Sequence, residues 1–87
     1  MSLKQDIIDT ITTALPDANV YVADPDGEHF EALVVSQSFE EMSLVKQHQS
    51  VMKPLKSHFD TSVHALALKT FTPKQWEEKK HLYNLNL

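Results

Sequence analysis

The segment VHALALKTFTPKQW, residues 63–76, is the strongest structural signal in the chain. Apolar and β-favouring residues predict a strand over residues 63–70. A helix over residues 73–83 follows, because its start carries an N-cap residue, a proline in the first turn and a glutamine three residues after the cap. These three positions are Thr72, Pro73 and Gln75. The chain therefore changes from strand to helix within two residues.

The other elements are predicted from hydrophobic periodicity, turn residues and prolines. They are a helix over residues 3–15, strands over residues 19–23 and 29–36, a helix over residues 44–52 and, after a break at Pro54, a short helix over residues 54–59. The order is α-β-β-α-α-β-α. The helical connection between the second and third strands is long enough for a crossover, which favours parallel pairing. We predict one compact α+β domain over residues 1–87, with helices packed on a three-stranded mixed sheet.

Two histidines lie near the beginnings of two strands. His29 opens the second strand and His64 is the second residue of the third. Parallel strands begin at one edge of a sheet, so both imidazoles are expected at that edge. Whether they share a face stays open, because a one-residue register change inverts the answer. From the residues alone, a histidine bonded to a backbone carbonyl is a better explanation of His64 than a metal ligand. For His29, a metal ligand and an exposed loop residue are equally good explanations.

The amino-acid composition excludes several classes of functional site. Cysteine is absent, which excludes disulfides, thiol nucleophiles and thiolate metal sites supplied by this chain alone. The formal net charge is −4 and all basic residues are lysines, which is atypical of a nucleic-acid binder. The candidates for such contacts are Lys46, Lys53 and Lys56. With one glycine, the chain has no glycine-rich phosphate loop and no nucleophile elbow, so we predict that it is not an enzyme.

No segment has the length and hydrophobicity of a membrane span, and no signal peptide precedes the first predicted helix. We therefore expect a cytoplasmic protein with no membrane partner.

Four segments resemble the BolA-like protein family and cover nearly the whole chain. They are GEHF (27–30), VVSQSF (34–39), LVKQHQSV (44–51) and the segment 63–76. GEHF and the KPL after the middle helix look most like the short IbaG-type branch. The resemblance implies a fold similar to the type II KH domain, in agreement with the predicted element order.

The resemblance also implies a role. Members of this family pair with monothiol glutaredoxins, and the heterodimer can hold a 2Fe–2S cluster. The glutaredoxin cysteine and a glutathione thiolate supply sulfur, while the BolA-like partner supplies a histidine that matches His64. A second candidate ligand of the family matches His29. The resemblance thus implies an adaptor in iron–sulfur and iron homeostasis and in the stress response. No cofactor is expected in the isolated chain, which we expect to be a monomer or a weak dimer.

A DNA-binding regulator of stress or cell-envelope genes, also proposed for the family, is the alternative. Many members carry Arg-His-Arg in the middle helix, where this chain has Gln47, His48 and Gln49. Many also carry a glycine where this chain has Glu41. The missing guanidinium groups weaken DNA binding more than they weaken cluster binding.

Overall fold

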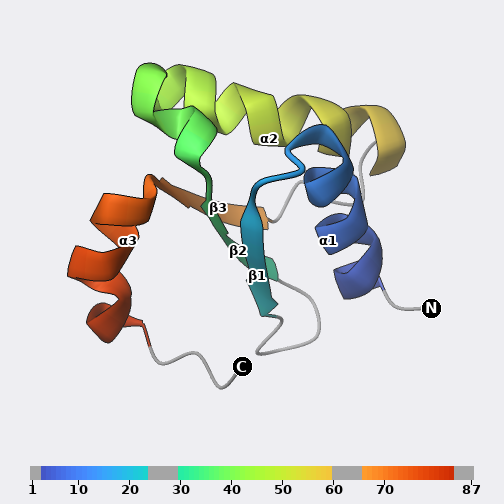
Figure 1. Ribbon diagram of the computed structural model, residues 1–87. Helices are drawn as coiled ribbons and strands as arrows, with labels where there is room; N and C mark the ends of the chain where they lie inside the picture. Colours follow the sequence, from blue (N-terminus) through green and yellow to red (C-terminus); the bar gives the residue numbers. More distant parts are fainter. Residues whose placement is uncertain (1–2, 24–29, 60–65, 84–87) are drawn as a thin grey trace.

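The structure is a computed structural model, and it describes residues 3–23, 30–59 and 66–83. The elements, in chain order, are α1 (Leu3–Ala14), β1 (Asn19–Ala23), β2 (Phe30–Val35), the 3-10 helix η1 (Gln37–Glu41), α2 (Leu44–Phe59), β3 (Leu66–Phe71), α3 (Pro73–Lys79) and the 3-10 helix η2 (Lys80–Leu82) (Figure 1). Residue 29, with which the predicted second strand begins, the start of the predicted third strand at 63–65 and the chain end at 84–87 lie outside the described residues.

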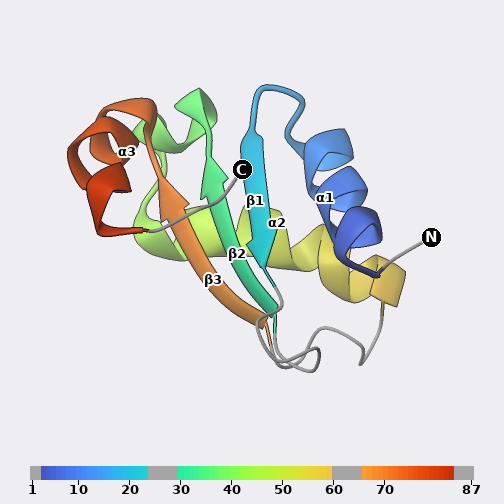
Figure 2. The ribbon, with the colours of Figure 1, turned by 90° about the horizontal axis from the view of Figure 1, so that it is seen from below.

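The three strands form one mixed sheet in the order β1-β2-β3. β1 pairs antiparallel with β2, and β2 pairs parallel with β3. The parallel register places Phe30 beside Leu66 at the beginning of both strands and Val35 beside Phe71 at their ends. The predicted parallel pairing and the α+β class are therefore confirmed, and the N-terminal ends of β2 and β3 lie at the same end of the sheet (Figure 2).

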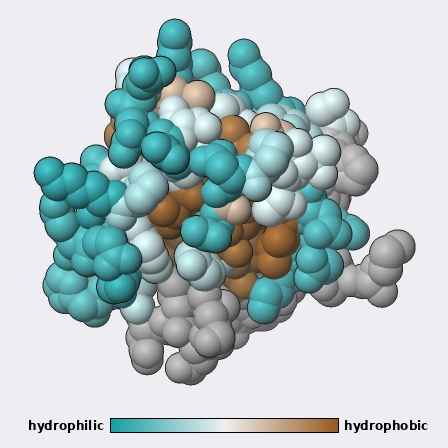
Figure 3. Space-filling model, viewed as in Figure 1, coloured by the Kyte–Doolittle hydropathy of each residue, from teal (hydrophilic) through white to brown (hydrophobic). Residues whose placement is uncertain are grey.

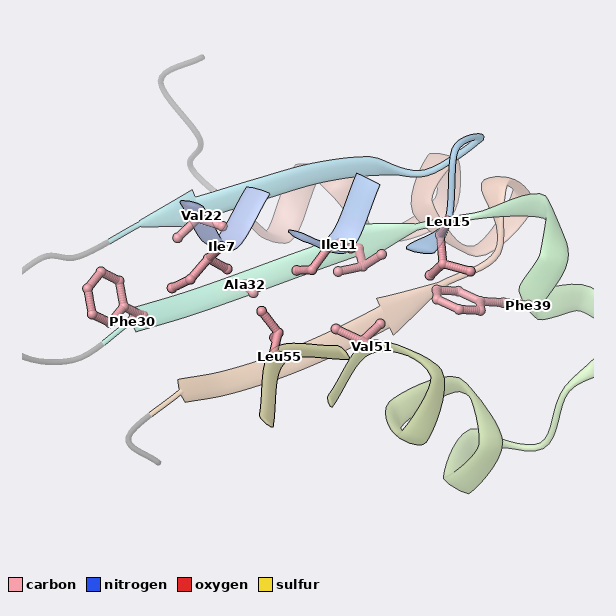
Figure 4. Packing of buried hydrophobic residues seen from close by; sticks show 10 residues of the cluster. Ile7, Ile11, Leu15, Val22, Phe30, Ala32, Phe39, Val51 and Leu55 are labelled. Carbon is pink, nitrogen blue, oxygen red and sulfur yellow. The ribbon is translucent and has the colours of Figure 1, made fainter. Parts of the chain in front are cut away.

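Helices α1 and α2 cover one face of the sheet, and α3 lies on the opposite face (Figures 1 and 2). The main core lies under α1 and α2 (Figure 4) and consists of Ile7, Ile11, Leu15, Val22, Phe30, Ala32, Val34, Phe39, Val51 and Leu55. Burial of each large aliphatic or aromatic side chain contributes about 1.5–3 kcal/mol. Hydrophobic surface also remains around β1, between hydrophilic side chains, in the view of Figure 3.

A smaller aromatic cluster covers the opposite face of the sheet. Leu33 and Val35 alternate with the residues of the main core along β2, so this central strand is buried on both faces. Trp76 of α3 stacks against Tyr21 with ring centroids 5.6 Å apart and against Tyr83 at 5.9 Å. The predicted capping box is confirmed: Thr72 Oγ1 accepts from the Gln75 backbone N–H, and the Gln75 side chain accepts from the Thr72 N–H. This cap fixes the start of α3 beside the sheet.

The expected break at Pro54 is wrong, because α2 is one helix of 16 residues with Pro54 inside it. The predicted order α-β-β-α-α-β-α has two α-helices between the second and third strands. The structure has one, α2. Val51 and Leu55 flank the proline and are both fully buried, so core packing on each side offsets the cost of the missing N–H. No helix in the described ranges is long and apolar enough to cross a membrane.

A buried glutamine links three elements on the α2 side of the sheet. Gln47 Nε2 donates to the carbonyl oxygens of Phe39 and Met42, each at 3.1 Å, and Gln47 Oε1 accepts from Thr70 Oγ1 at 2.7 Å. The side chain is only 7% exposed, whereas the apolar Val45 of the same helix is 65% exposed. The buried stripe of α2 is therefore Gln47, Val51 and Leu55, at a spacing of four residues.

Candidate functional site

The two histidines expected as ligands, His29 and His64, lie outside the described residues. The structure does place the first residue of each strand that follows them. Phe30 of β2 and Leu66 of β3 are partners in the parallel register, at the edge where both strands begin. His29 directly precedes Phe30 in the chain, and His64 is two residues before Leu66. The described residues that follow the two histidines in the chain are therefore neighbours in the sheet.

This edge is held by the main core. Phe30 is buried and lies at the same end of the core as Val22 and Ile7 (Figure 4). Leu66 is half-buried and packs against the same cluster. The beginnings of β2 and β3 are thus tied to α1 and to each other, which gives the segments before them a fixed point of attachment.

Within the described ranges, no group of three histidine, cysteine, aspartate or glutamate side chains is arranged to hold a metal ion. His48 is half-buried on α2 and His81 is exposed on η2.

The three lysines proposed for nucleic-acid contacts are brought together. Lys46, Lys53 and Lys56 are exposed, and their spacings of seven and three residues place them along one side of α2. Gln47, in contrast, is buried, so a change at that position alters the interior of the domain and not the exposed side of the helix. Only Gln49, which is exposed, bears on the predicted loss of positive charge from this surface.

Asp17, in the loop after α1, forms a polar network that the sequence did not reveal. Its carboxylate accepts from Ser36 Oγ at 2.9 Å, from the Gln37 backbone N–H at 3.0 Å and from Ser38 Oγ at 3.3 Å. The Ser36 hydrogen bond, with smaller contributions from Gln37 and Ser38, holds the pKa of Asp17 below its ordinary value. The partners lie 19 to 21 residues away along the chain, so no local pattern signals the contact. Asp17 anchors the start of η1.

The surface of the described residues has two shallow grooves. One lies between α1 and α2 and is lined by Asp6, Asp9, Thr10, Thr13, Ala14, Pro54 and Ser57. The hydroxyls of Thr10 and Thr13 donate to carbonyls of their own helix, so they are not activated as nucleophiles. The other groove borders Asp17 and is lined by Pro16, Gln37, Ser38, Glu40 and Glu41. In the second groove Ser38 Oγ donates to the Asp17 carboxylate, and among the described residues neither lining contains a histidine.

The fold and the arrangement of its helices define a small α+β domain of the BolA type, and comparison with known proteins agrees. A family model described as BolA-like protein matches residues 9–75. Acid stress protein IbaG of Escherichia coli (strain K12) is 35% identical over 80 residues, which cover 91% of this chain and 94% of that protein.

A solved BolA protein homologue from Coxiella burnetii has a TM-score of 0.72 and 40% sequence identity, and the match covers 88% of this chain and 99% of that one. The DNA-binding transcriptional regulator BolA of Haemophilus influenzae is 39% identical over 49 residues, which cover 56% of this chain and 48% of that protein. The chain belongs to the BolA-like family. Its similarity to IbaG over most of both chains confirms the predicted branch.

Proposed function

We propose that this protein is a non-enzymatic cytoplasmic adaptor that binds a monothiol glutaredoxin and shares a 2Fe–2S cluster with it. The single observation that carries the proposal is the parallel register of Phe30 with Leu66. His29 directly precedes Phe30 and His64 lies two residues before Leu66, and we propose that the two imidazoles serve one site. In this proposal His64 is a ligand of the cluster and His29 the second candidate.

The composition supports a shared site and not a resident one. Iron–sulfur clusters are held mainly by cysteine thiolates, and histidine replaces cysteine in only some of them. This chain has no cysteine, so every sulfur ligand has to come from glutaredoxin and glutathione. The described residues offer no competing metal group of their own. An imidazole ligand must be deprotonated to bind metal, so acidification would weaken this ligation. That property suits a relative of a protein named for acid stress.

Anaerobic reconstitution of the glutaredoxin cluster, with and without this protein, tests the proposal. We expect a new absorption and circular dichroism spectrum at a ratio of one to one, which is lost in His64→Ala. His81→Ala is the matched control, because His81 is exposed on η2 at the C-terminal part of the chain. Far-ultraviolet circular dichroism of the isolated variants checks the fold. An unchanged cluster spectrum with His64→Ala would rule out this ligand.

DNA binding is the second candidate, and the exposed lysines on one side of α2 favour it, together with the name of the Haemophilus influenzae relative. The net charge of −4 opposes it. If Lys46, Lys53 and Lys56 each neutralise one phosphate, the logarithm of the affinity falls with that of salt concentration with a slope of about −3. Changing all three to glutamine should flatten that slope, whereas the same change at Lys4, Lys74 and Lys79 should not. Binding that is indifferent to salt would exclude this function.

A further inference from the structure

The outer edge of β3 has no neighbouring strand among the described residues. The strand order leaves β3 outermost on the side opposite β1, and α1 lies alongside β1 (Figure 2). Along β3, Leu66 and Leu68 are only half-buried although they face the main core, and Ala67 and Lys69 are exposed. An open edge of this kind offers unpaired backbone groups to another strand.

The backbone direction of β3 follows from one hydrogen bond. The Ser36 N–H donates to the Phe71 carbonyl at 3.1 Å, so the peptide groups of Phe71 point toward β2. Peptide groups of alternate residues in a strand point to opposite sides. The N–H and C=O of Lys69 therefore also point toward β2, whereas those of Leu66 and Leu68 point outward. An added strand would form its hydrogen bonds with these two leucines and with Thr70, whose peptide groups point the same way.

Two charges lie near this edge without an ion-pair partner among the described residues. Glu31 of β2 is the register partner of Ala67, and Lys69 is two residues further along β3. All three side chains therefore project from the same face of the sheet. Glu31 and Lys69 are exposed. Ala67 is exposed and its side chain ends at Cβ, so it leaves room for a long side chain beside Glu31.

We propose that a second copy of this chain binds antiparallel along β3, with the two-fold axis at Leu68. In this register Leu68 of one copy exchanges two backbone hydrogen bonds with Leu68 of the other, and Lys69 lies opposite Ala67 of the other copy. Lys69 then faces Glu31 across two strand spacings, roughly 10 Å between Cα positions, within the joint reach of the two side chains.

The charges select this register over its neighbours. Centring the pair on Lys69 sets two lysines directly opposite each other, which is unfavourable. Centring it on Ala67 moves Lys69 two residues past Ala67 of the other copy and away from Glu31. Pairing of a single short edge buries less than the roughly 1,200 Å² of a standard interface, so the dissociation constant is on the order of 0.1 mM. This inference does not depend on the cluster or on glutaredoxin.

Sedimentation velocity between about 10 µM and about 1 mM measures the association. Lys69→Glu and Glu31→Lys should each weaken the dimer at least about tenfold, since each places like charges together. The double variant restores the pair with its signs exchanged and should recover the dimer, a result that loss of the fold in the single variants would not predict. Lys4→Glu is the control, because it makes the same charge change on α1, beyond the far edge of the sheet.

Amide hydrogen exchange gives a second readout. The outward N–H of Leu68 should exchange more slowly as the concentration of the protein rises, whereas the N–H of Lys69, already bonded to β2, should not respond. A chain that stays monomeric over the whole range, or dimers of equal strength with Lys69→Glu and Lys4→Glu, would overturn the proposal.

Discussion

Replacing Gln47 with methionine isolates the buried polar link between η1, α2 and β3. Methionine has nearly the length of glutamine and a similar helix propensity, so the helix and the volume of the core are preserved. The change removes the amide that donates to Phe39 and Met42 and that accepts from Thr70. The loss of stability then reports on these hydrogen bonds and on little else.

The expected magnitude follows from the surroundings of each partner. The Phe39 carbonyl keeps a second donor, the Met42 N–H at 3.1 Å, so its loss is small. The Thr70 hydroxyl is buried and loses its acceptor, which costs about 1–3 kcal/mol. With about 1 kcal/mol for the Met42 carbonyl, the total is about 2–4 kcal/mol. A domain of this length has a free energy of unfolding of about 4–13 kcal/mol, so the variant should be severely weakened.

Urea unfolding followed by circular dichroism measures this loss, and a midpoint lower by about 1–3 M is expected. Gln49→Met is the matched control, because it makes the same substitution at an exposed position of α2 and should change stability by less than about 0.5 kcal/mol. In the double variant with Thr70→Val, neither partner remains polar, so the two losses should not add. Equal midpoints for Gln47→Met and Gln49→Met would refute the reasoning.

Two further changes test other parts of the fold. Asp17→Asn should lower stability at neutral pH. Because the folded pKa of Asp17 lies below the ordinary 3.8, its contribution is complete above that value and lost as pH falls further. Urea midpoints of both proteins should therefore converge below pH 3.8, and a constant gap would contradict the Ser36 contact. Pro54→Ala should raise stability by about 1 kcal/mol, since it restores a helical N–H but removes packing beside α1; a lower thermal midpoint would show that the packing dominates.

Much of the fold could be predicted because its signals are local. Thr72 and Gln75 form their capping box within one turn, and residues 19–23 are a strand in both the prediction and the structure. The parallel pairing of β2 with β3 followed from connection length alone. Predicted bounds of the first helix and of the second strand differ from the structure by one residue at an end, which is the usual ambiguity of element ends.

The misses have one physical origin, which is contact between distant residues. Pro54 stays inside α2 because Val51 and Leu55 are buried against other elements, and local propensity cannot register that energy. Gln47 is polar, yet it is a core residue. Its amide donates to the carbonyls of Phe39 on η1 and of Met42, and it accepts from Thr70 on β3. The histidine site depends on the segments that hold His29 and His64, and on atoms of a second protein, so its ligands remain a prediction.

Trp76, the single tryptophan, lies between Tyr21 and Tyr83 on the α3 side of the sheet. Energy transfer from Tyr21 to the indole should therefore be most efficient while α3 is docked on the sheet. Its emission reports on the aromatic cluster, whereas far-ultraviolet ellipticity follows all the helices, including the two on the opposite face. Comparing the two optical signals during unfolding shows whether the two sides of this sheet melt as one cooperative unit or in succession.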